Sequence, residues 1–94
     1  MKHDILVKYN ETVTDKKAME AEVRNLFQGV LSVEGVHGVA VIPNTVERPN
    51  RYDLLIEIEM EPSALSAYDE CETHKQWKKN YAQYLEGKAI FDHD

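Results

Sequence analysis

The segment from Tyr52 to Glu61 constrains the fold more than any other part of the chain. Every second residue is apolar, and this set is Tyr52, Leu54, Ile56, Ile58 and Met60. The residues between them are mostly acidic. Because successive side chains of a strand point to opposite faces, one face belongs to a core and the other is mostly charged. The chain therefore needs a layer that covers only one face of a sheet.

Three other segments are predicted to be strands. Residues 3–9 alternate in the same way, so one face carries His3, Ile5, Val7 and Tyr9. Residues 36–42 are rich in β-branched side chains and end at Pro43-Asn44, which is typical of a strand and its terminator. Residues 88–93 form the predicted last strand.

Two segments are predicted to be helical. The first helix covers about residues 15–32, with Thr14 as its N-cap, Gly29 near its end for close packing or simple tolerance, and Gly35 as its stop. A second, broken helix begins at Pro62. Thr73 is expected to cap its second piece, which ends at Gly87 and has one stripe of His74, Trp77, Tyr81 and Leu85.

The order of these elements is strand, helix, strand, strand, broken helix, strand. This order predicts an α+β, ferredoxin-like βαββαβ protomer over residues 1–94, a single domain with helices on one face of a four-stranded antiparallel sheet. The other face would carry Leu6, Lys8, Leu55, Glu57 and Glu59. Such a mixed surface is either solvated or covered by a second sheet across a dimer axis.

Composition excludes several classes of function. The 94 residues include 11 Lys plus Arg and 17 Asp plus Glu, a net charge of −6, which argues against a nucleic-acid partner. No apolar run approaches the roughly 18 residues of a membrane span. A chain this small buries little core, so a homodimer is the expected source of further stability. The lone Cys71 is expected to be a free thiol in a cytoplasmic protein.

The sequence resembles the stress-responsive dimeric A/B barrel (Dabb) family over nearly its whole length. The resemblance lies in Lys2 to Tyr9, Gly35-Val36, Pro43-Asn44, Tyr52 to Glu59, the spacing of Tyr68 and His74, and Ile90-Phe91-Asp92. It implies a ferredoxin-like protomer whose sheet faces that of a second copy, so that two helix-free faces line a shared barrel. The chain departs from the family where Cys71-Glu72 replaces a His-Pro pair.

The resemblance also implies a candidate site. A plant polyketide cyclase of this family performs a cofactor-free aldol closure with the tyrosine and histidine that match Tyr68 and His74, and a histidine matching His3 lines its pocket. An imidazole can take a proton next to a carbonyl while a phenol holds the enolate oxygen. The predicted helix start at Thr73 favours a neutral His74. We expect Trp77 and Tyr81 to line the pocket of a small, aromatic or polyketide-like ligand, with no cofactor and no metal.

Less specific interpretations compete with this one. Ordinary packing also accounts for Tyr68, His74 and His3, and a buried helix face also accounts for Trp77 and Tyr81. Asp92-His93-Asp94 is expected to be frayed and solvated rather than a metal site. The alternatives to a small-molecule enzyme or binder are a non-catalytic stress-response or scaffold dimer and a small cofactor-free monooxygenase.

Overall fold

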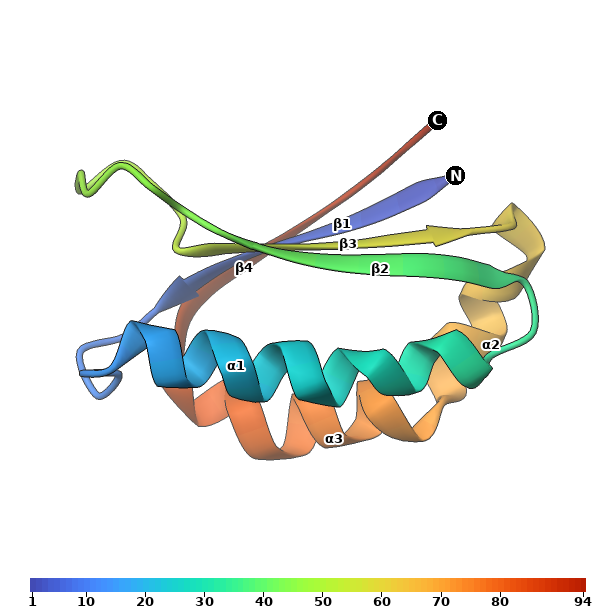
Figure 1. Ribbon diagram of the computed structural model, residues 1–94, viewed down its shortest axis with the longest axis horizontal. Coiled ribbons are helices and arrows are strands. Elements are labelled where there is room, and N and C mark those ends of the chain that lie inside the picture. The colour runs from blue at the N-terminus through green and yellow to red at the C-terminus, as the bar shows by residue number, and fades with distance from the viewer.

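The computed structural model describes residues 1–94 and has two layers, a sheet and a layer of helices below it (Figure 1). The four strands are antiparallel and lie in the order β2-β3-β1-β4. Their bounds are β1 Lys2–Tyr9, β2 Val36–Pro43, β3 Leu54–Met60 and β4 Leu85–His93. This is the predicted ferredoxin-like α+β fold, with the first and third strands in the centre of the sheet.

All the helices cover the same face of the sheet (Figure 1). They are α1 (Lys16–Phe27), α2 (Leu65–Glu70) and α3 (Glu72–Tyr81), with 3₁₀ turns at Gln28–Ser32, Pro62–Ala64 and Ala82–Tyr84. The broken second helix begins at Pro62 as predicted, because proline lacks an N–H that the first helical residue does not need. No helix of the structure combines the length and the apolar character that crossing a bilayer requires.

The core lies between the two layers and follows the alternation of the sequence. In β1 every second residue from His3 to Tyr9 is buried, and in β3 the buried set is Leu54, Ile56, Ile58 and Met60. Ile5 pairs with Ile56 in the ladder, so these side chains share the helix-covered face. Val23, Phe27 and Trp77 close the core from the helical side.

The first helix differs from its prediction at both ends. Its N-cap is Asp15 rather than Thr14, because the Asp15 carboxylate accepts a hydrogen bond from the backbone N–H of Ala18 at 3.0 Å. The α-helix ends at Phe27, and the predicted range to residue 32 is completed by a 3₁₀ turn. A Cβ built on Gly29 would lie 2.2 Å from the Thr73 hydroxyl oxygen, so close packing accounts for this glycine.

Two predictions about the last helix were wrong. Cys71, not Thr73, is the N-cap of α3, and its sulfur accepts the backbone N–H of His74 at 3.5 Å. Thr73 is buried inside the first turn, and its hydroxyl donates to the Leu26 carbonyl. The helix also ends before Leu85, which begins β4 opposite Tyr9, so that Gly87 lies within the strand. Pairing with β1 determines this boundary rather than the helical spacing.

The helix-free face of the sheet has an apolar row with charged residues beside it. The ladder places Ile42, Leu55, Leu6 and Ala89 in register across all four strands. Phe91 lies on the same face and is 64% exposed. Asp4, Glu57 and His93 lie close together at one end of this face. The predicted mixed surface is therefore present.

Candidate functional site

The structure brings together the three predicted site residues from separate elements. His3 comes from β1, Tyr68 from α2 and His74 from the first turn of α3. The ring centroids of His3 and Tyr68 are 5.3 Å apart, and those of Tyr68 and His74 are 4.9 Å apart. Tyr68 thus lies between the two histidines, and we call these three side chains the ring cluster. The break between α2 and α3 at Cys71 persists without the His-Pro pair.

A fourth residue, Asp92 of β4, orients His3. His3 Nδ1 lies 2.5 Å from an Asp92 carboxylate oxygen, and a carboxylate can only accept a hydrogen bond when ionised. Nδ1 therefore carries a proton. His3 and Asp92 are paired in the ladder between β1 and β4, so the sheet itself sets this contact. Sequence analysis did not assign Asp92 a role, because 89 residues separate it from His3.

His74 presents a proton-accepting nitrogen. Its Nδ1 lies 2.8 Å from the backbone carbonyl oxygen of Asp69, which can only accept. The proton of a neutral His74 is therefore on Nδ1, and the lone pair is on Nε2. No protein group donates a hydrogen bond to Nε2 in the structure. This arrangement allows His74 to act as a general base.

The Tyr68 hydroxyl is buried without a partner. Tyr68 is 1% exposed, and its hydroxyl oxygen makes no hydrogen bond. Burial raises the pKa of this phenol well above its usual value, and the nearby Cys71 and Asp69 raise it further. The phenol therefore stays protonated at neutral pH and can donate a hydrogen bond to an oxygen atom. A buried donor without an acceptor costs folding free energy, which a ligand oxygen would recover.

His74 is the member of the ring cluster that borders a surface hollow next to α3. A hollow of about 560 Å³ is lined by Asp69, His74, Lys75, Lys78 and Lys79, and we call it the His74 hollow. Its residues belong to α2 and α3, and none is hydrophobic. Tyr68 lies behind His74, and His3 is 6% exposed. The cluster is therefore sealed on the sheet side and accessible through His74.

Trp77 and Tyr81 pack the helices together. Trp77 is 2% exposed, meets Phe27 of α1 edge-on at 5.3 Å and stacks on Tyr81 at 5.5 Å. The Tyr81 hydroxyl donates to a Glu22 carboxylate oxygen at 3.3 Å. Neither residue lines the His74 hollow. In this structure they hold α3, and with it His74, against α1.

A separate polar cluster lies on the helix-free face. His93 Nε2 is 2.8 Å from an Asp4 carboxylate oxygen and 4.0 Å from one of Glu57. The expectation that the C-terminal residues are frayed was wrong for His93, because β4 pairs with β1 as far as Lys2 and His93. Asp4 raises the pKa of the Glu57 carboxyl through a hydrogen bond, and a hydrogen bond to Asp4 also raises the pKa of His93. These three side chains have the types and spacing that a divalent cation could use.

Comparison with known proteins finds a similar fold in solved structures. No family model matches the chain, and no curated protein matches it.

Solved structures share the fold over almost the whole chain. A dimeric ferredoxin-like protein from Bacteroides fragilis matches with a TM-score of 0.79 at 16% identity, covering 99% of this chain and 93% of the other. A dabb family protein from Mesorhizobium loti matches with a TM-score of 0.72 at 9% identity, covering 99% and 93%. A Bacteroides thetaiotaomicron protein described as a candidate antibiotic biosynthesis monooxygenase matches with a TM-score of 0.74 at 15% identity, covering 100% and 87%. The chain therefore has the ferredoxin-like fold of the Dabb structures, as predicted.

Proposed function

We propose that this protein is a Dabb-type enzyme or binder that acts on a small enolisable carbonyl compound at the ring cluster, without a cofactor. The proposal rests on the contact between Tyr68 and His74. The Tyr68 phenol is protonated and has no hydrogen-bond acceptor, and Nε2 of His74 has no hydrogen-bond donor. A ligand with a carbonyl oxygen and an acidic C–H next to it supplies both missing partners. The rings of the cluster would contact an aromatic or polyketide-like compound that reaches the phenol.

Each residue has a distinct role in this chemistry. His74 Nε2 removes the proton from the carbon next to the carbonyl, and the Tyr68 hydroxyl donates to the oxygen on which negative charge develops. His3, held by Asp92, packs against the far side of the Tyr68 ring and positions it. Because the Tyr68 hydroxyl is inaccessible in the closed protein, the ligand enters past His74 and displaces the side chains that cover the phenol.

Proton exchange into a simple probe tests this function. Phenylacetone in D₂O exchanges the protons next to its carbonyl only slowly without a base, and ¹H NMR follows their loss. We expect the protein to accelerate this exchange, and His74→Ala to reduce the acceleration by about a hundredfold, the usual contribution of a positioned base. Tyr68→Phe should also reduce the rate, because the enolate oxygen loses its donor.

His37→Ala is the matched control, since His37 is an exposed histidine on β2 outside the ring cluster. It should exchange the probe at the rate of the unmodified protein. Exchange no faster than in buffer with the unmodified protein, or full activity in His74→Ala, would contradict the proposal. Oxygen consumption that depends on the probe would instead favour a monooxygenase.

We also propose that two copies pair through their helix-free faces. The apolar row of that face and the exposed Phe91 need a cover, and a protein with this fold is dimeric. Analytical ultracentrifugation should show a dimer that Leu55→Lys dissociates, whereas Leu31→Lys, at an exposed leucine of the helical layer, should not. A monomer at all concentrations would contradict the pairing. A cytoplasmic location stays a prediction from the single cysteine.

A further inference from the structure

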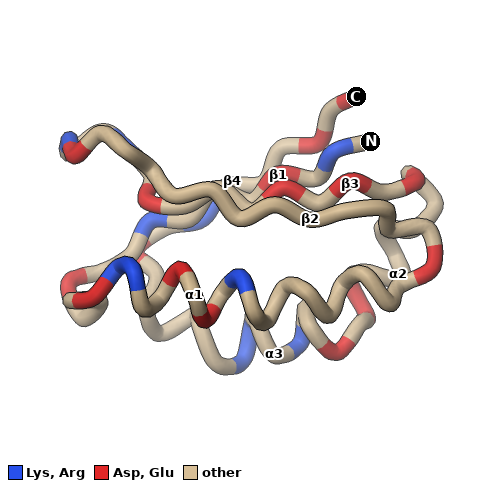
Figure 2. The backbone as a smooth tube through the Cα atoms, in the orientation of Figure 1, with Lys and Arg blue, Asp and Glu red and all other residues tan.

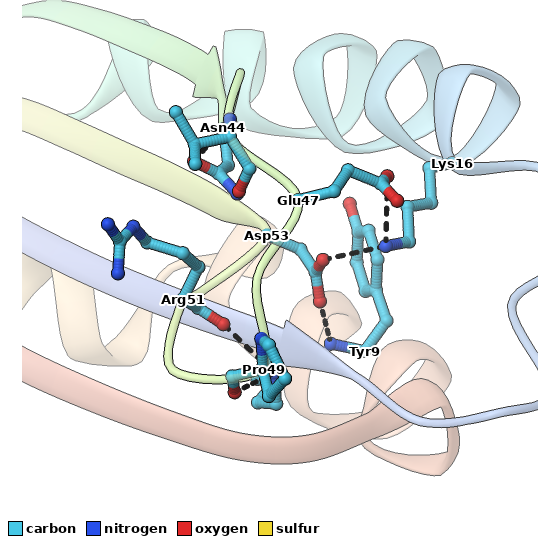
Figure 3. A network of polar contacts seen from close by, with 9 residues as sticks. Tyr9, Lys16, Asn44, Glu47, Pro49, Arg51 and Asp53 are labelled. Atoms are coloured by element: carbon cyan, nitrogen blue, oxygen red, sulfur yellow. Dashed lines mark hydrogen bonds and ion pairs between the residues drawn. The ribbon is translucent and has the colours of Figure 1, made fainter.

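A second polar site lies at the opposite end of β1 from the ring cluster. A cleft of about 760 Å³ opens between the end of β1, the start of α1 and the loop of residues 44–53 that joins β2 to β3 (Figure 3). Because Tyr9 lines this cleft, we call the cleft the Tyr9 cleft. Only three of its sixteen lining residues are hydrophobic, so its occupant must be polar.

Hydrogen bonds hold the walls of the cleft in place. The Asp53 carboxylate accepts from the backbone N–H of Tyr9 at 2.8 Å and from Lys16 Nζ at 2.9 Å (Figure 3). Lys8 Nζ donates to the carbonyl of Arg51 at 2.9 Å. These contacts tie the loop to β1 and to α1. The cleft is therefore formed before any ligand arrives.

Tyr9 lines the cleft, and its hydroxyl, buried just behind the surface, is a hydrogen-bond donor that has no acceptor. The residue is 8% exposed, and its hydroxyl oxygen is buried and makes no hydrogen bond. Burial, followed by the charges of Asp53 and Glu20, raises its pKa to about 12. The hydroxyl is thus protonated at neutral pH. An oxygen atom of a ligand would supply the hydrogen-bond acceptor that the Tyr9 hydroxyl lacks.

Positive charge without a carboxylate partner lies on the rim. Lys17 and Arg48 line the cleft and form no ion pair, whereas Lys16 is paired with Asp53. Figure 2 shows basic and acidic residues side by side at the start of α1 and at the tip of the loop of residues 44–53. The guanidinium of Arg51 turns away from the cleft (Figure 3).

We propose that the Tyr9 cleft binds a small polyhydroxylated anion, a sugar phosphate or a sugar acid. Its anionic group lies by Lys17 and Arg48, and a hydroxyl or ring oxygen accepts the hydrogen bond of Tyr9. The remaining hydroxyls donate to the carboxylates of Glu20 and Glu47, which also line the cleft. This site is distinct from the ring cluster and does not depend on its chemistry.

A ¹⁵N–¹H NMR titration tests the site with two probes, glucose 6-phosphate and glucuronate. Both should move the amide signals of residues 9–17 and 44–53 in a saturable way, and the tighter probe tells whether phosphate or carboxylate is preferred. Glucose and inorganic phosphate should each bind at least about tenfold more weakly, because each supplies only half of the contacts. No saturable binding of either probe, or binding no tighter than that of inorganic phosphate, would overturn the proposal.

Two variants assign the contacts. Tyr9→Phe removes one hydroxyl that has no partner, so it should fold normally and weaken the tighter probe about tenfold. The double variant Lys17→Gln/Arg48→Gln should weaken it at least as much. Lys75→Gln, in the basic His74 hollow, is the matched control and should bind unchanged. Unchanged affinity in both cleft variants, or loss of affinity in Lys75→Gln, would place the anion elsewhere and contradict the assignment.

Discussion

The two ends of β1 place a buried tyrosine hydroxyl in opposite kinds of surroundings. At each end a buried tyrosine hydroxyl lacks a partner, Tyr68 beside His3 and Tyr9 itself at the other end. Around Tyr68 the neighbours are aromatic rings in direct contact, and His74 borders a hollow at the surface. Around Tyr9 the neighbours are charged groups that line an open cleft.

The difference follows from what covers each end of the sheet. At one end the short helix α2 places the Tyr68 ring 5.3 Å from the His3 ring, and both side chains are buried. At the other end the polar loop of residues 44–53 arches away from the helices (Figure 1) and leaves a hollow whose walls are pinned by Asp53. One strand thus supports a sealed acid–base cluster and an open polar cleft, and the following substitutions compare the two.

The largest effect on stability is expected from adding a methyl group at the sealed end. Gly29→Ala places a Cβ against the Thr73 hydroxyl in the first turn of α3, and overpacking of this kind costs about 1–3 kcal/mol of unfolding free energy. Gly87→Ala, opposite Lys8 at the open end, meets no atom within 4 Å and should change stability little. Urea unfolding measures both. Equal losses in the two variants would show that the sealed end is no more tightly packed.

Removing the two orphaned hydroxyls should have an intermediate effect. Tyr68→Phe and Tyr9→Phe each delete a buried group without a partner, so each should leave stability unchanged or raise it by about 1 kcal/mol at neutral pH. Because burial raises the pKa of Tyr9 from about 10 to about 12, the folded state resists ionisation of this phenol, and the stability of the folded state falls as the pH rises from 10 towards 12. Unfolding measured between pH 10 and 12 should therefore depend less on pH in Tyr9→Phe. A loss of stability at neutral pH in either variant would reveal a hydrogen bond that the structure lacks.

The smallest effect concerns carboxylates, which also differ between the two ends. Asp53 at the open end is satisfied by Lys16 and by a backbone N–H, whereas Glu57 on the helix-free face meets Asp4. Because its raised pKa costs stability above the unfolded value near 4.5, Glu57→Gln should raise the free energy of unfolding at pH 7 by about a few tenths of a kcal/mol. The melting temperature should rise slightly as a result. Glu59→Gln, two residues along the same strand, should not raise it. A lower melting temperature for Glu57→Gln would mean that its attraction to Lys2 and His93 exceeds the repulsion.

The sequence predicts those features of the fold that depend on local periodicity. Alternation in residues 3–9 places His3 and Tyr9 correctly on the helix-covered face, and the order of elements predicts the sheet. Alternation also predicts the buried face of β3 from Leu54 to Met60, but Tyr52 lies before this strand and is 41% exposed. Local signals fail where tertiary contacts compete with them. Leu85 fits the stripe of the preceding helix, yet pairing with Tyr9 draws it into β4.

The candidate site residues also differ in whether a local sequence signal or only a tertiary contact indicates them. Tyr68 and His74 are six residues apart around a helix break, so the resemblance to a family indicates both. Asp92 acts on His3 across the whole length of the chain, and the Tyr9 cleft combines residues from β1, α1 and the 44–53 loop. These contacts could not be predicted from spacings in the sequence, because they depend on strand register and on the course of a loop.

Long-range ¹H–¹⁵N NMR of the histidine side chains tests the central claim most directly, since it reports which nitrogen of each ring carries the proton. We predict that neutral His74 is protonated on Nδ1 and that its Nε2 is a free acceptor. The His74→Ala variant identifies the His74 signals, because they disappear from its spectrum. Addition of phenylacetone should shift the Nε2 resonance while leaving that of His37 unchanged. A neutral His74 protonated on Nε2 would contradict its role as the base at the ring cluster.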